Sequence, residues 1–284
     1  MYKIIVANEN NQQLTFNDLD GDFQITQISG LYPADALINT DQTALTDGGR
    51  YNSSKVNMRT INFGFSIEKN PEESRRKVYR VLQPKRYVKL NYTSELYDVY
   101  IEGYVANVIV NHFDKKQTVT FQMLCPFPYF RNAQLMVNEL TAVQGMFHFP
   151  FALPAAGEPF GEIVSVANAF IPNDGMIEAG LIIELYAKAG LSGIKVYNYA
   201  TQQYIGVDYT MQAGDLITIT TGQGDKTVTL LREGVKSNIF NSIMEGSTWL
   251  QLPSEGMTAV YTIEEGYNTD LIVTIKHYDL FEGV

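Results

Sequence analysis

The sequence predicts a mainly β protein, with one helix in its first half and a β-sandwich or jelly roll in its second half. Apolar and polar residues alternate over most of the chain, which is typical of half-buried strands. Residues 71–83 alone combine a helical apolar stripe with helix start and stop signals. From residue 181 onward, short strands and turns follow one another at close to regular spacing, as they do in sandwiches.

The first half is built from alternating strands. Segment 60–67 places four apolar side chains on one face, namely Ile61, Phe63, Phe65 and Ile67. Segment 118–124 places three apolar side chains on one face, namely Val119, Phe121 and Met123. The apolar phase of segment 97–110 changes at Gly103, which predicts a bulge or bend there because glycine tolerates the dihedral angles of a bulge. Residues 111–116 are expected to form the hairpin turn into the next strand.

The helix signals surround residues 71–83. Asn70 is expected to cap the helix, Pro71 suits its first position, and Pro84 ends it. Its apolar stripe consists of Val78, Val81 and Leu82. Glu72 and Glu73 lie at the positive end of the helix dipole, four residues before Arg76 and Lys77.

Residues 31–57 have weak periodicity and many turn formers. A segment of this length in a compact domain is a functional loop, a long hairpin or a disordered excursion. It is therefore the best candidate for reaching a neighbouring molecule.

The charge balance indicates two domains. Residues 1–130 hold 14 Lys and Arg against 14 Asp and Glu, whereas the remainder holds 7 against 17 and carries the whole net charge of -10. We place the domains at residues 1–133 and 134–284, with 134–160 as a proline-containing linker. The second half lacks the clustered Lys and Arg that phosphate binding needs, so no specific nucleic acid partner is expected.

The composition excludes several further classes of protein. A single cysteine excludes an intramolecular disulfide framework. No apolar run reaches the roughly 18–20 residues that span a bilayer, so no membrane partner is expected. The start of the sequence is too short and polar for a signal peptide, and we expect the protein to accumulate in the cytoplasm of the cell that makes it.

No catalytic, cofactor or metal site is predicted, and no cofactor. Cys125 in "LCPFPYF" has only three histidines as candidate bases (His112, His148 and His277), and none is spaced to pair with it, so a buried structural thiol is the better interpretation. No C-x-x-C, H-E-x-x-H or H-x-H pairing suggests zinc.

The remaining motifs are better explained by structural roles than by binding or catalytic sites. "DLDGD" (18–22) departs from a calcium loop and is expected to be a polar turn. "TGQGDK" (221–226) lacks phosphate-loop spacing and is expected to be a β-turn. Glu264 and Glu265 are expected to be surface charges, although glycosidase carboxylates can be distant in sequence. Trp249 could stack on a sugar, but packing in the core or at its rim is commoner.

The order of several motifs resembles the distal tail proteins of siphophages and related prophage tails. In the first half these motifs are "ITQISGLYPAD", "DGGRYNSSKVNMRTINFGFSI", one helix, "LQPKRYVKL" and a hairpin ending in "LCPFPYF". In the second half they are "FHFPFALP", "NDGMIEAGLIIELY", "YNYATQQYIGVDYTMQAGDLITITTGQGDKTVTLL", "SNIFNSIMEGSTWLQLPSEG" and "YDLFEGV". The resemblance covers nearly the whole chain.

This resemblance implies a β-rich amino-terminal domain (β-sandwich or barrel-like) that forms a hexameric ring, followed by a galectin-like β-sandwich. It implies a structural hub, not an enzyme, that joins tail tube and tape measure protein to tail-tip, tail-associated, fibre or receptor-binding proteins. The product would be made in the host bacterial cytoplasm and located in the virion, at the tail tip. "LCPFPYF" would then be the exit from the ring domain, with Cys125 structural.

Two rivals remain open: a carbohydrate- or receptor-binding module of the tail tip, and a β-sandwich cell-wall hydrolase. Galectins bind sugar through H-x-N-x-R and W-x-x-E-x-R strands, and neither occurs here, so we expect no galectin-type sugar binding. A ring of identical copies needs two different complementary patches on each copy. We expect the 31–57 segment to supply one of them, with Asp47, Gly48, Gly49 and Arg50 at or near its turn.

Overall fold

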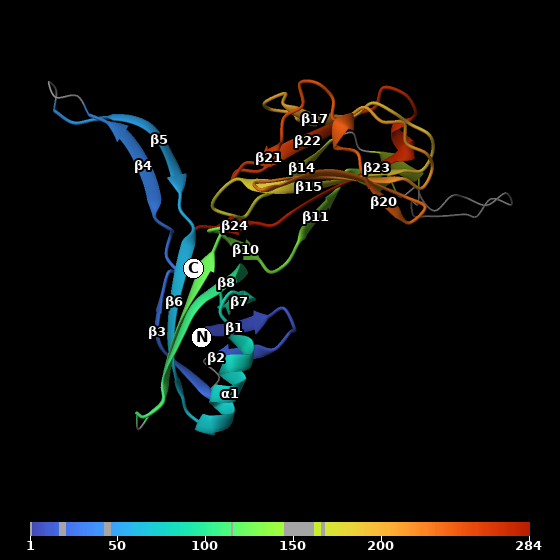
Figure 1. The fold of residues 1–284 in the computed structure, drawn as a ribbon. Coiled ribbons are helices and arrows are strands. Elements are labelled where there is room, and N and C mark those ends of the chain that lie inside the picture. Colours follow the sequence, from blue (N-terminus) through green and yellow to red (C-terminus); the bar gives the residue numbers. More distant parts are fainter. Residues whose placement is uncertain (1, 17–20, 43–46, 115, 145–161, 166–167) are drawn as a thin grey trace, which may run out of the picture. The chain divides into compact units, whose positions relative to one another are not determined.

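The computed structural model describes residues 2–16, 21–42, 47–114, 116–144, 162–165 and 168–284, and it is mainly β, as the sequence predicts (Figure 1). The chain divides into two compact units. Unit 1 comprises residues 1–133 and 280–284, and unit 2 comprises residues 134–279. The last five residues, which the sequence analysis assigns to the second domain, therefore return to the first. No helix in the described ranges is long and apolar enough to cross a bilayer.

Unit 1 is a curled antiparallel sheet with one α-helix. Along the sheet the strands follow the order β2-β1-β7-β8-β9-β6-β3, and β10 and β24 add to it at β8. The elements are β1 (Lys3–Asn8), β2 (Gln13–Phe16), β3 (Phe23–Ser29), β4 (Ala36–Asp41), β5 (Arg50–Val56), β6 (Arg59–Ile67), α1 (Pro71–Val81), β7 (Tyr87–Thr93), β8 (Asp98–Asn111), β9 (Thr118–Cys125), β10 (Phe130–Asn132) and β24 (Leu280–Phe281).

The core of unit 1 lies inside the curl of the sheet. The predicted alternation is confirmed, because Ile61, Phe63, Phe65 and Ile67 on β6 and Val119, Phe121 and Met123 on β9 are all buried. Phe16, on the end strand β2, packs 4.7 Å from Phe63 and 4.9 Å from Phe65, measured between ring centroids. The end strands β2 and β3 are not hydrogen-bonded to each other, so the sheet in the described residues does not close into a barrel.

The irregularity predicted at Gly103 is present in β8, but it lies further along the strand, between Val105 and Asn107. Burial alternates through Gly103 to Val105, and the register with β9 shifts between Val105 and Asn107, so Tyr104 and Ala106 face outward. Glycine is required at 103 for another reason. A Cβ there would lie 2.5 Å from the carbonyl oxygen of Leu124 and 3.0 Å from the sulfur of Cys125. The predicted β8–β9 hairpin is confirmed, with Asn111 paired to Thr118.

Helix α1 covers Pro71–Val81, two residues shorter than predicted. Pro71 takes the first turn, and Val78, Val81 and Leu82 are buried, as expected. Asn70 does not cap with its side chain, because its backbone is left-handed (φ 43°) and only its carbonyl accepts a bond, from the Ser74 amide. The helix ends early because Leu82 leaves helical geometry (ψ 73°) ahead of Pro84.

Unit 2 is a β-sandwich. One sheet has the order β11-β23-β15-β18-β19-β20, with β21 paired to β15, and the other has the order β14-β22-β16-β17. Alternate residues of β15, β18 and β23 are buried, which is expected when each sheet packs one face on the other. The elements are β11 (Met136–Glu139), β12 (Thr141–Gln144), β13 (Glu162–Ser165), β14 (Asn168–Ile171), β15 (Ala179–Ala187), β16 (Ile194–Asn198), β17 (Tyr204–Val207), β18 (Leu216–Gly222), β19 (Asp225–Arg232), β20 (Val235–Asn238), η1 (Phe240–Ser242), β21 (Gln251–Leu252), β22 (Met257–Thr262), η2 (Asn268–Asp270) and β23 (Leu271–His277).

Two predicted turns have different outcomes. Residues 221–226 form the expected β-turn, in which Gly222 pairs with Asp225 and Gly224 has a φ of 81°. Asp18 and Asp20 of "DLDGD", and residues 145–160 of the predicted linker, lie outside the described residues.

Candidate assembly surfaces

Residues 36–56 form a long hairpin of β4 and β5, one of the three alternatives that the sequence left open for segment 31–57. We call this hairpin the arm. Figure 1 shows it continuing from β3 and β6, at the opposite end of unit 1 from α1. β4 and β5 pair only with each other, and all but one of their residues are exposed.

The two faces of the arm differ in charge. Successive residues of a strand point to opposite faces. One face carries Ala36, Ile38 and Thr40 on β4 opposite Val56, Ser54 and Tyr51 on β5, and it has no charged residue. The other face carries Lys55, Asp41 and Arg50. Ile38 and Tyr51 are 61% and 60% exposed, so the uncharged face presents large apolar side chains to solvent.

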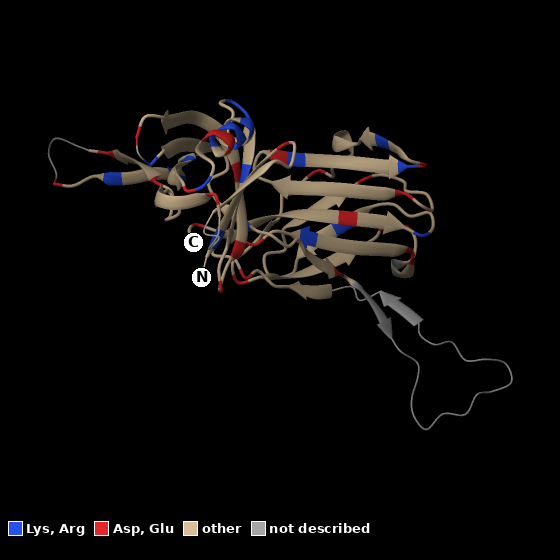
Figure 2. Ribbon diagram, turned by 90° about the horizontal axis from the view of Figure 1, so that it is seen from below, with Lys and Arg blue, Asp and Glu red and all other residues tan. Residues whose placement is uncertain are grey.

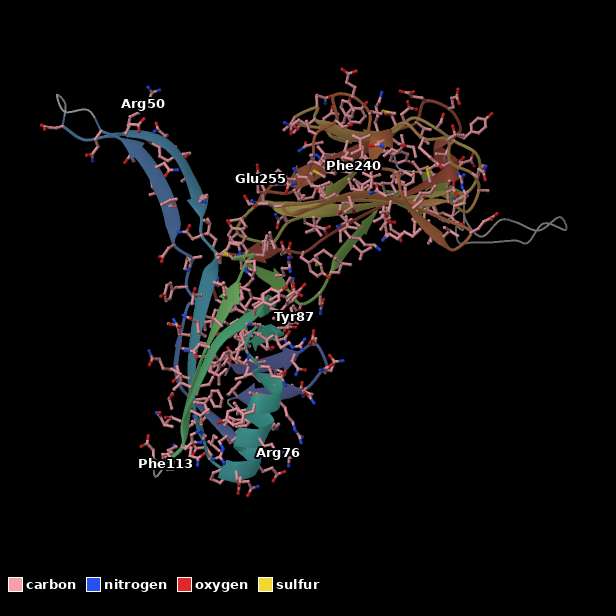
Figure 3. All side chains as sticks on the ribbon, in the orientation of Figure 1. Arg50, Arg76, Tyr87, Phe113, Phe240 and Glu255 are labelled. Carbon is pink, nitrogen blue, oxygen red and sulfur yellow. The ribbon has the colours of Figure 1, made fainter. Side chains whose placement is uncertain are left out.

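The expected contact residues lie toward the free end of the arm. Arg50 begins β5 and is paired with Asp41 in the strand register. Figure 3 labels Arg50 on the arm. Gly48 has a φ of 87°, which side chains rarely adopt, and a Cβ on Gly49 would lie 3.1 Å from the carbonyl oxygen of Asp41. Glycine is therefore needed at 48 for the turn itself. The role of Asp47, Gly48, Gly49 and Arg50 in assembly stays a prediction.

The base of the arm is organised by one buried arginine, Arg59, at the start of β6. Its Nε donates to the carbonyl of Pro128 at 2.6 Å, and its Nη1 donates to the carbonyls of Gly30 and Tyr32 at 2.7 and 2.5 Å. Its Nη2 donates to the carbonyl of Glu282. The guanidinium also lies over the ring of Phe130, 4.8 Å from its centroid. Burial lowers the pKa of Arg59, but a guanidinium stays charged at any physiological pH.

The last residues of the chain complete this base. β24 pairs with β10, and the amide of Val284 donates to the carbonyl of Leu31 at 3.0 Å. Arg59 therefore joins its own strand to three backbone segments that are distant in sequence, at residues 30–32, 128 and 282. Sequence reasoning missed Arg59. The alternation of the strand could have indicated its burial, because Arg59 lies on the same face as the buried Ile61 and Phe63.

Cys125 pairs with Arg59 in the β6–β9 register and is fully buried. Burial raises the pKa of its thiol to about 12, although the nearby Arg59 charge acts in the opposite direction. The thiol is therefore protonated at neutral pH and is a poor nucleophile. "LCPFPYF" is a structural joint, since its Pro128 carbonyl binds Arg59 and its Phe130 begins β10.

On the outward side of the sheet, residues 104–111 of β8 together with β9, β6 and β3 carry no charged side chain, and we call this part the uncharged sheet face. Glu102, earlier on β8, lies outside it and pairs with Arg131. The members of the uncharged sheet face are Tyr104, Asn107, Ile109, Asn111, Thr118, Thr120, Gln122, Leu124, Thr60, Asn62, Gln24, Gln27 and Ser29. Amides and hydroxyls are linked across the strands, for example Gln122 to Asn62 at 3.1 Å and Asn111 to Thr118 at 3.0 Å. Soluble surfaces usually carry roughly 25–35% charged residues, so this face is unusual.

Unit 2 holds a cavity of about 350 Å³ beside Trp249. Trp249 stacks on Phe240 with ring centroids 5.7 Å apart, and Lys226 Nζ lies 5.4 Å from the Trp249 ring centroid. Trp249 is partly buried, which agrees with the expected rim packing. Ile205, Asn241, Ile243, Ser247 and Thr248 complete the lining.

The other candidate groups do not assemble into a reactive site in the described residues. No cluster of three His, Cys, Asp or Glu side chains that could hold a metal occurs there. His112 is exposed and lies 3.3 Å from the Tyr79 hydroxyl, and His277 is buried beside Asp279. His148 lies outside the described residues. Glu264 is an exposed partner of Lys195, as the sequence analysis expects of a surface charge.

Comparison with known proteins identifies the fold. Residues 174–278 match the family of siphovirus-type tail components, C-terminal domain (SPP1_Dit). The Dit protein (gp 19.1) of phage SPP1, described as a paradigm of the hub adsorption apparatus in phages that infect Gram-positive hosts, is similar over 98% of this chain and 99% of its own. The TM-score is 0.67 and the identity 14%.

Two structures of the phage P2 baseplate in its activated conformation, with Ca and with Sr, are also similar to this chain. Their TM-scores are 0.52 and 0.53 at 16% and 14% identity, over 100% of this chain and 99% and 100% of theirs. A search of curated protein sequences finds no significant match. Residues 174–278 thus match the model of the C-terminal domain of siphovirus-type tail components, and the whole chain has the fold of the SPP1 Dit protein, which confirms the resemblance to siphophage distal tail proteins.

Proposed function

We propose that this chain is the distal tail hub of a phage or prophage tail, a structural protein without catalytic activity. Its copies form a closed ring, with six copies expected, around the tail channel. The ring joins tail tube and tape measure protein to the tail-tip, baseplate or receptor-binding proteins, and the protein is located in the virion. The observation that carries this proposal is the likeness to the SPP1 hub over nearly the whole of both chains.

The arm and the uncharged sheet face supply the two different patches that a head-to-tail ring requires. A hairpin paired with no other strand is marginally stable in water, so the arm gains from packing on a partner. Burying a charge without a partner is costly, and interface centres are depleted of charge. The uncharged face of the arm, with Ile38 and Tyr51, therefore suits the uncharged sheet face of the next copy, with Tyr104 and Ile109.

The tip residues Asp47, Gly48, Gly49 and Arg50 would extend this contact on the neighbouring copy. Their glycines allow close backbone approach, and Arg50 brings a charged group to the rim, where interfaces are polar. The Arg59 base fixes the direction in which the arm leaves unit 1. A closed ring depends on that direction being the same in every copy.

Removal of the arm tests this proposal. The amide of Asn57 donates to the carbonyl of Asp35 at 2.9 Å, so a short glycine turn can replace residues 36–56 without disturbing the base. We expect a folded monomer, observed by light scattering and circular dichroism. A ring that persists without the arm would contradict the assignment, as would one that persists after deletion of residues 36–48 alone.

A pair of point variants tests which face of the arm is used. Ile38→Glu places a charge on the uncharged face and should weaken the ring by about tenfold or more, because the carboxylate would be buried without a partner. Lys55→Glu is the matched control, since it places the same side chain on the face that already carries Asp41 and Arg50. Equal assembly of both variants would contradict the use of the uncharged face.

A second candidate function is the binding of a carbohydrate or receptor by unit 2, and the Trp249 cavity is the observation that favours it. Trp249 and Phe240 offer aromatic surface, and Asn241 and Thr248 offer polar groups at the same place. This function would accompany the hub role. For a cell-wall hydrolase, the described residues provide neither an accessible thiol nor a cluster of metal ligands.

A further inference from the structure

Positive charge is concentrated on α1 and the loop that follows it, in a chain whose net charge is -10. Between Ser74 and Ser94 the sequence holds seven Lys and Arg and no Asp or Glu. They are Arg75, Arg76, Lys77, Arg80, Lys85, Arg86 and Lys89. Figure 2 shows blue segments gathered on the helix.

The helix presents this charge outward because its opposite side is buried. Ser74, Val78 and Val81 pack on the sheet, so Arg76 and Arg80, one turn apart, face away from it. Arg76, Lys77 and Arg80 line a groove of about 330 Å³ together with Asp22, Asn70, Glu73 and Ser74.

Part of this charge has partners in the chain. Lys77 lies 3.8 Å from Asp22, Arg86 lies 3.4 Å from Glu9, and Lys89 lies over the ring of Tyr100. Arg75, Arg76 and Arg80 make no side-chain ion pair with any residue that the structure describes. Among the described residues, no acid competes with a second molecule for these three arginines.

Aromatic side chains lie beside this surface. Tyr79, on the same helix, is 43% exposed and lies 3.3 Å from His112 Nε2. Phe113, the next residue at the tip of the β8–β9 hairpin, is fully exposed, and Figure 3 labels it there. Arginine and aromatic residues dominate the energetic centres of protein interfaces, so this combination favours a protein partner.

We propose that this surface of α1 and Phe113 binds unit 2 of a second copy of the chain. Unit 2 holds 6 Lys and Arg against 16 Asp and Glu, so its net charge is opposite to that of the α1 surface. Asp22 and Glu73 lie in the same groove and would repel the phosphates of a nucleic acid, whereas a protein surface can pair with both signs. This contact is separate from the ring contact of the arm and does not depend on it.

Cross-linking of isotope-mixed protein tests the contact. Unlabelled and ¹⁵N-labelled full-length chains are mixed at low salt and treated with a carbodiimide, which couples lysine amines to carboxylates. We expect mixed-isotope peptide pairs that join Lys77 or Lys85 to a carboxylate within residues 134–279. Lys195 and Glu264, 2.9 Å apart in one chain, are the internal positive control. Recovery of that control without the mixed-isotope pairs would overturn the proposal.

Charge reversal supplies the second test. Arg76→Glu with Arg80→Glu should reduce the mixed-isotope Lys85 products by about tenfold or more, because two attractive charges become repulsive. Lys3→Glu with Lys55→Glu changes the net charge equally at exposed sites of unit 1 outside α1 and should leave the products unchanged. An equal loss in both variants would indicate general repulsion and overturn the proposal.

Two further outcomes separate this contact from its alternatives. The cross-links should persist when residues 36–56 are replaced by a short turn, so that failure of the ring and failure of this contact are distinguishable. A fluorescent DNA duplex serves as the other probe. The proposal would be overturned if the Arg76/Arg80 variant alone lost duplex binding while its cross-links stayed unchanged, because this result would show a nucleic acid site.

Discussion

Replacement of Arg59 by methionine is expected to loosen the base of the arm and destabilise unit 1. Methionine is similar in length and apolar, so packing against Phe130 is largely retained. The carbonyls of Gly30, Tyr32, Pro128 and Glu282 lose their donor. The substitution therefore isolates the hydrogen bonds of the guanidinium from its bulk.

The magnitude follows from the burial of those carbonyls. Leaving a buried acceptor without a donor costs about 1–3 kcal/mol. The bond to Gly30 is buried, whereas the other three are partly buried and can be rehydrated. We expect the free energy of unfolding of unit 1 to fall by about 3–5 kcal/mol, a large share of the roughly 5–15 kcal/mol that holds a typical domain.

Hydrogen exchange and denaturant unfolding measure this loss. The Val284 amide, bonded to Leu31, should lose protection, because β24 is held by the same base. Trp249 lies in unit 2, so its fluorescence should still report an intact sandwich while circular dichroism reports the loss in unit 1. Arg50→Met on the exposed arm is the matched control and should change stability by less than about 0.5 kcal/mol.

Arg59→Lys refines the test. Lysine keeps the charge but cannot present the planar fork of donors, so we expect an intermediate loss. If Arg59→Met cost less than about 1 kcal/mol and left Val284 protected, the reasoning on the arm base would be refuted.

Three further predictions follow from the buried contacts of both units. Gly103→Ala should lower the free energy of unfolding by about 2–4 kcal/mol, as measured with denaturant, because the added Cβ would meet the backbone of Leu124. Gly222→Ala is the control, since its Cβ enters open space and should leave stability unchanged. Equal effects of the two substitutions would contradict the close approach at Gly103. Burial lowers the pKa of His277 against the opposing charges of Asp279 and Asp174, and its Nδ1 has no partner among the described residues. Since the unfolded chain then binds the proton first, unit 2 should lose stability as pH falls below about 6.5, as followed by Trp249 fluorescence. His277→Phe should reduce this dependence and His112→Phe should not; identical pH profiles in both variants would contradict it. Millimolar lactose should leave Trp249 emission unchanged, and micromolar glycan binding that Trp249→Ala abolishes would contradict the expected absence of galectin-type binding.

The sequence predicts best the strands that are paired on both sides and buried on one face. β6 and β9 are such strands, and their alternation appears directly in the residues. The phase change of β8 was predicted at Gly103 because Tyr104 and Ala106 are apolar and suggest a buried face. Both side chains point outward in the structure. Only the β9 register shows where the phase changes.

The assembly surfaces were harder to predict for two different reasons. The arm packs on nothing else in the chain, so no apolar period marks its strands. The Arg59 base depends on carbonyls from residues 30, 32, 128 and 282, which only the folded chain brings together. The basic stretch 75–89 was visible in the sequence, but its exposure depends on which side of α1 is buried.

The proposed closure of copies of this chain into a ring through the arm can be tested by light scattering of the purified full-length protein, supported by negative-stain images. We expect a species of about 190 kDa, the mass of six 31.9 kDa copies, with a central hole. A monomer that persists at high protein concentration would contradict it.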